Sequence, residues 1–181
     1  MWKESVNAVA IEMKPRCIKM ILPDGHTVDF LPDVLGEIIK WLQTEVNMPE
    51  AGGFLVGYKD YRSGNISIDG LSHPYLLDVR SRCHFKIKDP KHKFFLFNAK
   101  ARKSFYMGVW HTHPQTIPIP SSIDWRDWQE TLMVDKTACK YVFFLIAGTE
   151  SARVWVGDLT SKQIKEIVEC EKEGDLYKEV K

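Results

Sequence analysis

The sequence predicts one α/β (α+β) domain in which a mixed β-sheet is flanked by helices. Short segments of β-type composition alternate with amphipathic helical stretches, and no linker, repeat or low-complexity tract divides the 181 residues. Hydrophobic residues make up 44% of the chain, which is enough for one packed interior in a chain of this length. We expect a single domain over residues 1–181, with its core at about residues 17–170 and a frayed, charged C-terminal tail.

Strands are expected where β-branched and aromatic residues cluster between turn signals. The Asp24–Gly25 pair predicts a tight turn that joins the first strand to one ending near Phe30. The strand-like segments lie at residues 17–22, which precede that turn, and at 53–57, 65–71, 83–87, 105–111, 141–147 and 152–156.

Helices are expected where apolar residues recur at three- and four-residue spacing. The clearest stripe includes Val34, Leu35 and Ile38. In the third helix Ser121 or Ser122 is the expected N-cap, because both follow Pro120 and precede an acidic first turn. The four expected helices lie at residues 32–46, 90–103, from 121 or 122 to about 134, and after 160, the last with Ile164, Ile167 and Val168 facing inward.

Charge and composition restrict the partners and the compartment. The formal net charge of +1 gives no global field that favours nucleic acid or an anionic membrane. No apolar run approaches the roughly 20 residues of a membrane span, and the N-terminal segment lacks the apolar stretch of a signal peptide. A cytoplasmic protein is therefore expected. Its widely spaced cysteines form no CxxC pair and are expected to be reduced, buried thiols: Cys17, Cys83, Cys139 and Cys170.

The segment Gly108–Trp125 carries a candidate metal site. His111 and His113 are two residues apart, so on a strand both imidazoles point to the same side. Three prolines then keep the chain extended until the helix that contains Asp124 begins. Two nitrogens and one carboxylate leave a fourth tetrahedral position open, which is the arrangement of a catalytic zinc. We expect one Zn²⁺ per chain, bound by these three residues.

Hydrolysis at such a zinc also needs a carboxylate that is not a ligand, because a proton must leave the attacking water and reach the leaving group. Glu50 is the candidate general acid/base, and Gly52 and Gly53 behind it allow a close backbone approach. Ser121 is the candidate donor to the oxyanion formed at the carbonyl.

These residues resemble the JAMM motif of the JAB/MPN metalloproteases. The match comprises a glutamate before a Gly-rich strand, His-x-His-Pro, seven intervening residues, a serine, and an aspartate three positions later, and it spans about Pro32 to Gly157. The resemblance implies a cytidine-deaminase-like fold and hydrolysis of the bond after the tail of a ubiquitin-like modifier. It also implies that His111, His113 and Asp124 bind zinc, that Glu50 is the general acid/base, and that Ser121 supports the tetrahedral intermediate.

The sequence is most similar in size to stand-alone prokaryotic JAB peptidases. Among these it resembles the peptidases encoded with bacterial antiphage signalling (CBASS-type) systems, which remove a nucleotidyltransferase from its conjugates. The expected partner is therefore a ubiquitin-like protein or another conjugated protein. The choice between an isopeptide and a linear peptide bond stays open, as does homodimerisation.

Three other functions fit the same residues less well. A non-catalytic MPN scaffold would lack metal ligands that are all present here. A RadC-like DNA-associated protein shares the His-x-His-Pro and Ser-x-x-Asp spacing, but this chain has no upstream helix-hairpin-helix region. A nucleoside deaminase would need a Pro-Cys-x-x-Cys motif, which is absent from the sequence.

Two surface features have open interpretations. Between Arg80 and Lys103 there are nine Lys or Arg residues and one acid, Asp89. This segment is either a contact surface for an acidic partner or a solvated helix face with aromatic side chains buried beneath it, namely Phe85, Phe94, Phe95 and Phe97. The tryptophans around the motif either wall a groove or pack in the core, and they are Trp110, Trp125 and Trp128.

Overall fold

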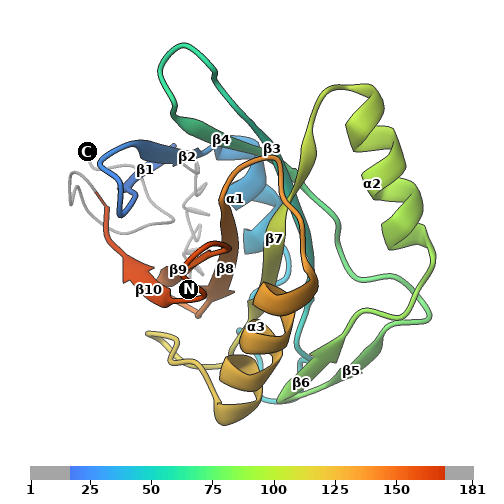
Figure 1. The fold of residues 1–181 in the computed structure, drawn as a ribbon. Helices are drawn as coiled ribbons and strands as arrows, with labels where there is room; N and C mark the ends of the chain where they lie inside the picture. The colour runs from blue at the N-terminus through green and yellow to red at the C-terminus, as the bar shows by residue number, and fades with distance from the viewer. Residues whose placement is uncertain (1–16, 170–181) are drawn as a thin grey trace, which may run out of the picture.

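The computed structural model describes residues 17–169, which form an eight-stranded mixed sheet with helices on both faces (Figure 1). The strand order is β1-β2-β4-β3-β7-β8-β9-β10. The pairs β2–β4 and β7–β8 are parallel, and the other neighbours are antiparallel. The elements of this sheet are β1 (Ile18–Ile21), β2 (Thr27–Phe30), β3 (Gly52–Lys59), β4 (Ile66–Leu71), β7 (Phe105–Thr112), β8 (Tyr141–Ala147), β9 (Ala152–Asp158) and β10 (Ile164–Ile167). The mixed sheet with flanking helices confirms the predicted fold class.

The sheet separates two hydrophobic clusters. Helix α1 (Pro32–Ile39) inserts Val34, Leu35 and Ile38 into the larger cluster on one face. Helix α3 (Ser122–Val134) covers the other face, where Trp128 and Leu132 pack on β8 and β9. Every residue of β8 is buried, because this central strand contributes alternate side chains to both clusters. Strand β7 pairs with β8 on one edge and with β3 on the other, so hydrogen bonds fix both of its edges.

The turn at Asp24–Gly25 joins β1 to β2 as predicted, and Gly25 has a φ of 85°. The first helix is shorter than predicted, ending at Ile39 instead of residue 46. Beyond that point Trp41 and Leu42 donate to carbonyls three residues back, so the helix tightens and the chain turns toward the site. The second helix, α2 (Lys91–Ala101), lies within the predicted range, and the third helix has Ser121 as its N-cap.

The fourth predicted helix is wrong. Its residues form strand β10, which pairs antiparallel with β9 at the sheet edge. A tight turn precedes it, in which Lys162 has a φ of 59° and the Asp158 N–H donates to the Gln163 carbonyl. The β-branched residues after this turn suit a strand. Ile167 is buried as expected, but Val168 is 66% exposed. The predicted frayed tail lies outside the described residues.

A separate hairpin of β5 (Val79–Ser81) and β6 (His84–Lys86) stands apart from the main sheet (Figure 1). Only its second strand was predicted. The carboxylate of Asp78 joins the segment before this hairpin to the segment after it. It accepts hydrogen bonds from the backbone N–H groups of Tyr75, Lys88 and Asp89 at 2.8, 2.8 and 2.9 Å.

Asp78 also faces helix α2. Its Oδ2 lies 2.7 Å from Nε2 of His92, and Nδ1 of the same ring lies 2.7 Å from the hydroxyl of Ser72. The side chains of Asp78 and His92 are almost completely buried. Burial alone would raise the pKa of Asp78, but the hydrogen bonds from three backbone N–H groups and His92 hold that pKa below its usual value. This buried cluster anchors the hairpin to α2 and β4.

The cysteine prediction needs correction. Cys17 is exposed, Cys83 is exposed at the turn between β5 and β6, and Cys139 is partly buried. Cys170 lies outside the described residues. Within residues 17–169, no helix has the length and apolar character needed to span a bilayer.

Candidate metal centre and active site

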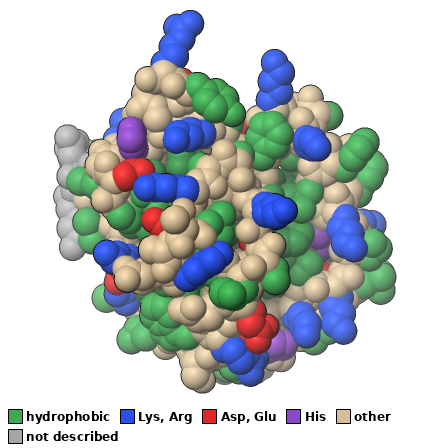
Figure 2. Space-filling model, viewed as in Figure 1, with side chains coloured by type: hydrophobic (Ala, Val, Ile, Leu, Met, Phe, Trp, Pro, Cys, Tyr) green, Lys and Arg blue, Asp and Glu red, His purple; other side chains and the backbone are tan. Residues whose placement is uncertain are grey.

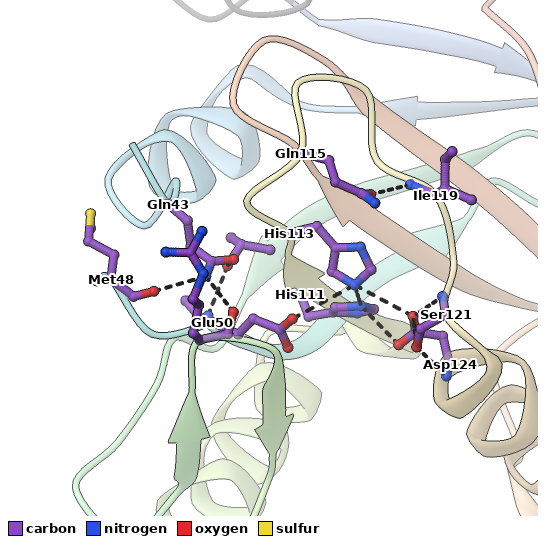
Figure 3. Close-up of polar contacts among 12 residues, drawn as sticks. Gln43, Met48, Glu50, His111, His113, Gln115, Ile119, Ser121 and Asp124 are labelled. Atoms are coloured by element: carbon purple, nitrogen blue, oxygen red, sulfur yellow. Dashed lines mark hydrogen bonds and ion pairs between the residues drawn. The ribbon is translucent and has the colours of Figure 1, made fainter. Parts of the chain in front are cut away.

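Strand β7 presents the two histidines on one side (Figure 3). His111 is in the strand, and the N–H of His113 extends the parallel pairing by donating to the Ala147 carbonyl at 2.9 Å. Because alternate residues share a face, the two rings converge, and their Nε2 atoms are 3.0 Å apart. Both residues lie beside β8, so the most buried strand of the sheet fixes their positions.

Asp124 reaches the same point from the first turn of α3 (Figure 3). Its Oδ1 lies 3.1 Å from Nε2 of His111, and its Oδ2 lies 3.5 Å from Nε2 of His113. A capping box holds the carboxylate, since the backbone N–H and the hydroxyl of Ser121 both donate to Oδ2, at 2.6 and 2.7 Å. Asp124 therefore serves the helix N-terminus and the cluster at once.

The proline-containing loop between the histidines and α3 is held by the turn between β8 and β9. The Thr149 N–H donates to the Gln115 carbonyl at 2.8 Å, and Arg153 donates to the Pro118 carbonyl at 3.2 Å. Within the loop, the Gln115 side chain accepts from the Ile119 N–H at 2.7 Å. These contacts set the distance between the end of β7 and the start of α3.

Glu50 lies in the segment between α1 and β3 and is 5% exposed. Its Oε1 is 3.9 Å from Nε2 of His113, so it borders the cluster without belonging to the tightest group (Figure 3). Burial raises the pKa of Glu50 to about 7, against the opposing charge of His113. A carboxyl group with this pKa can both accept and donate a proton near neutral pH.

The electrostatics of the cluster favour bound positive charge. Burial alone would raise the pKa of Asp124, but hydrogen bonds from His111, His113 and Ser121 hold that pKa far below its usual value. Burial alone would lower the pKa of His113, but the hydrogen bond and the charge of Asp124 outweigh burial and raise it. The carboxylate thus stays ionised and attracts protons or a cation to the two rings.

The donor set fits a zinc ion. Zn–N and Zn–O bonds of about 2.0–2.1 Å at a tetrahedral centre separate neighbouring ligand atoms by about 3.3–3.4 Å. The two Nε2 atoms are 3.0 Å apart, and each ring has an Asp124 oxygen at a similar distance, Oδ1 at 3.1 Å from His111 and Oδ2 at 3.5 Å from His113. Among the residues the structure describes, these three form a group capable of holding a metal ion, with all ligand atoms within 4.8 Å of one another.

A cleft of about 600 Å³ opens over this cluster. One wall is the β5–β6 hairpin, with His84, Phe85 and Lys86, and the opposite wall is α3 with Ile123. Glu50, the two histidines, Ser121 and Asp124 all line it.

Two glycines of β3 permit this arrangement. A Cβ on Gly52 would lie 2.5 Å from the ring of Phe85, which packs the hairpin against the strand. A Cβ on Gly53 would lie 2.1 Å from the Ser72 carbonyl oxygen. The close backbone approach predicted for both positions is confirmed.

Two of the three tryptophans combine the two predicted roles, core packing and a place in the cleft wall. Trp110 and Trp128 are buried, at 1% and 3% exposure, and both also line the cleft. Trp125 is 39% exposed and lies edge-on to Trp128, with ring centroids 5.2 Å apart. Trp110 and Trp128 therefore belong to both the core and the cleft wall, whereas Trp125 is not among the residues that line the cleft.

Lys and Arg side chains are interspersed with exposed hydrophobic ones across the face shown in Figure 2, and helix α2 of the basic segment lies at the right of this view (Figures 1 and 2). The prediction that its aromatic side chains are buried is wrong for Phe94 and Phe97, which are 64% and 71% exposed. Helix α2 buries only His92 and Ala99, so most of its circumference faces solvent. A contact surface for an acidic partner stays a prediction.

Sequence reasoning missed two buried polar residues beside the site. Gln43 is 3% exposed and Thr112 is fully buried. The sequence does contain a hint for Thr112, because a residue with a hydroxyl group stands between the two candidate histidine ligands. No local pattern pointed to Gln43, because it lies within the helix predicted at residues 32–46, whereas the observed helix ends at Ile39.

An α/β domain with two histidines and an aspartate clustered in a cleft, and a buried glutamate beside them, has the architecture of a metal-dependent hydrolase. Comparison with known proteins then identifies the family. The model for prokaryotic homologs of the JAB domain matches residues 32–157, and the chain belongs to this family.

Two curated proteins, both named CD-NTase/cGAS isopeptidase, are similar to this chain. The protein of Escherichia coli is 30% identical over 147 residues, covering 80% of this chain and 88% of its own length. The protein of Vibrio cholerae is 27% identical over 144 residues, covering 78% of this chain and 81% of its own length. The solution structure of a Desulfitobacterium hafniense protein has the same fold, with a TM-score of 0.54 and 20% identity over 76% of this chain and 87% of that one.

Proposed function

We propose that the chain is a zinc-dependent isopeptidase that releases a CD-NTase from its conjugates in bacterial antiphage defence. One observation carries the proposal: the side chain of Glu50 borders a His-His-Asp cluster in a cleft, in a chain similar to two proteins named CD-NTase/cGAS isopeptidase. The nature of the reaction follows from these groups, and the substrate follows from the relatives.

The residues have separate roles in this proposal. His111, His113 and Asp124 hold one zinc ion per chain. When bound, zinc supplies Lewis acidity that makes a water molecule more acidic and a carbonyl more electrophilic. Glu50 accepts a proton from the attacking water and delivers it to the leaving lysine nitrogen as the C–N bond breaks. The backbone N–H and the hydroxyl of Ser121 orient Asp124. The hydroxyl, which lies in the cleft lining, is the proposed donor to the oxyanion after it turns away from Asp124, while the Ser121 N–H keeps its hydrogen bond to that carboxylate.

The substrate enters as an extended tail between the hairpin and α3. The β6 strand and the loop after His113 both line this cleft, and Phe85 occupies the space above Gly52. Main-chain hydrogen bonds to a narrow cleft select an extended segment with small side chains next to the scissile bond. Such a tail belongs either to the CD-NTase itself or to a ubiquitin-like modifier.

The decisive experiment incubates the purified protein with two conjugates, one carrying the tail of a CD-NTase and one carrying a ubiquitin-like tail, each linked to a lysine. The wild type should release the CD-NTase, and a zinc chelator should stop the release until zinc is restored. Glu50→Gln should retain zinc and lose activity by about 10²- to 10⁴-fold. His113→Ala should lose both zinc and activity.

Each contrary result is informative. Release of only the ubiquitin-like tail would refute the CD-NTase as substrate. Cleavage by Glu50→Gln at the wild-type rate would refute the proposed acid/base. A purified protein that binds no zinc would refute the enzymatic proposal as a whole and favour a scaffold.

We also propose that the enzyme works in the cytoplasm. Cys83 and Cys139 are free thiols in the described part of the chain, as expected in a reducing compartment.

A further inference from the structure

The segment that carries Glu50 has no regular secondary structure, yet Glu50 must stay within reach of the cluster. One backbone hydrogen bond and one side-chain hydrogen bond hold its main chain on the hairpin side. The Glu50 N–H donates to the Ser81 carbonyl at 2.8 Å, and Nε of Arg80 donates to the Glu50 carbonyl at 2.7 Å. The general acid/base is therefore attached by its main chain to the strand that walls the cleft.

A buried amide ties this segment to two further places. Nε2 of Gln43 donates to the Met48 carbonyl and to the Arg82 carbonyl, both at 2.9 Å (Figure 3). Oε1 of Gln43 accepts a hydrogen bond from the Thr112 hydroxyl at 3.2 Å. One side chain thus joins the end of the α1 region, the Glu50 segment, the hairpin turn and strand β7.

Thr112 completes the connection to the metal cluster. It lies between the two histidines on β7, so its side chain points to the opposite face of the strand. Its hydroxyl oxygen accepts from the Ala51 N–H at 2.9 Å, directly after Glu50. Both Thr112 and Gln43 are buried, so water cannot replace a hydrogen bond that either of them loses.

We infer that Gln43 and Thr112 are positioning residues: their shared hydrogen bonds fix Glu50 relative to His111 and His113 and link that position to the β5–β6 hairpin. The inference rests on the proposed function for its effect on catalysis, but not for its effect on structure. A displacement of about 1 Å at a catalytic group can lower a rate about 10²-fold.

Two shape-preserving variants test this network. Thr112→Val removes the hydroxyl and leaves the Ala51 N–H without its acceptor, while Gln43→Met removes the amide from a chain of similar length. Each should lower kcat by about 10- to 100-fold, with zinc content unchanged and KM altered far less. The double variant should lose little more than either single variant, because both act on one network. Thr112→Ser, which keeps the hydroxyl, should restore kcat.

A matched control separates positioning from general destabilisation. Ser104 is also buried, and its hydroxyl donates to Asp69 at 2.6 Å far from the cluster at the other end of β7. Ser104→Ala should lower the melting temperature comparably and leave kcat of the folded protein unchanged. Equal losses of kcat in Ser104→Ala and Thr112→Val would overturn the inference.

A second readout does not depend on activity. Amide hydrogen exchange should accelerate in residues 44–51 and 80–83 of Thr112→Val and Gln43→Met, but not in Ser104→Ala. Unchanged protection in both network variants would overturn the inference even if the wild type cleaves conjugates. An inactive wild type would refute the proposed function alone, and the exchange pattern would still decide the positioning role.

Discussion

Replacing Asp78 by asparagine tests whether its buried carboxylate holds the hairpin in place. Oδ1 accepts from the N–H groups of Lys88 and Asp89, and Oδ2 accepts from Tyr75 and faces His92. The asparagine amide has the same shape but only one acceptor oxygen. Its NH₂ group must therefore replace either Oδ1 or Oδ2 and face the N–H donors that bind that oxygen.

The less costly orientation turns the NH₂ group toward Tyr75 and His92. The His92 ring can then carry its proton on Nδ1, donate to the Ser72 hydroxyl oxygen and accept at Nε2, which leaves the Tyr75 N–H unpaired and takes from the Ser72 hydroxyl its acceptor on His92. The lost hydrogen bond to a charged oxygen and the unpaired donor together predict a loss of about 2–4 kcal/mol in the free energy of unfolding. Urea denaturation of the wild type and Asp78→Asn at pH 7 measures this difference.

The direction of the pKa shift of Asp78 predicts how the stability difference between wild type and Asp78→Asn changes with pH. The pKa of Asp78 is lowered in the folded protein, so its ionised form adds stability above the unfolded pKa of 3.8. That stability is lost as the pH falls through the lower folded pKa, and the gap between wild type and Asp78→Asn should narrow in acid. Asp60→Asn is the control, since Asp60 accepts similar hydrogen bonds in an exposed turn and should matter less. A constant gap down to pH 3, or no gap at pH 7, would refute the reasoning.

Three further results are expected. Zinc should raise the melting temperature of the chelator-treated protein in scanning fluorimetry. At a free zinc concentration 100 times the Kd, binding adds about 2.7 kcal/mol to the free energy of unfolding. An unchanged melting curve would contradict the metal site. Gly53→Ala should lower the free energy of unfolding by about 1–3 kcal/mol because its Cβ would lie 2.1 Å from the Ser72 carbonyl oxygen, whereas Gly70→Ala meets only a side chain at 3.1 Å and should cost less. Ser121→Ala should cost about 1 kcal/mol as a lost helix cap and weaken zinc binding by calorimetry; equal zinc affinity would show that Asp124 does not need the Ser121 hydroxyl.

The sequence predicted best those features that depend on local patterns. The convergence of His111, His113 and Asp124 followed from strand alternation, a proline-rich connection and a helix cap, all within 14 consecutive residues. The fold class followed from alternating strand and helix compositions. The catalytic roles of these residues remain predictions that the experiments above address.

Features that depend on long-range contacts escaped prediction. Ile164 and Ile167 have a helix-like spacing, but an open edge of β9 makes them a strand, and no local pattern reports a sheet edge. The exposure of Phe94 and Phe97 likewise follows from α2 touching the sheet along a narrow stripe. Gln43 acquires its partners only when residues 48, 82 and 112 meet in three dimensions.

The separate origin of Glu50 has a practical consequence. The three metal-binding candidates come from one short stretch of chain, whereas Glu50 arrives from a different segment, 61 positions before His111. Altering that one carboxylate should therefore disable bond cleavage while leaving the zinc-holding scaffold and the cleft whole. An immobilised Glu50→Gln protein would act as a bait that grips intact conjugates from cell extracts, and mass spectrometry of the retained material would reveal its natural targets.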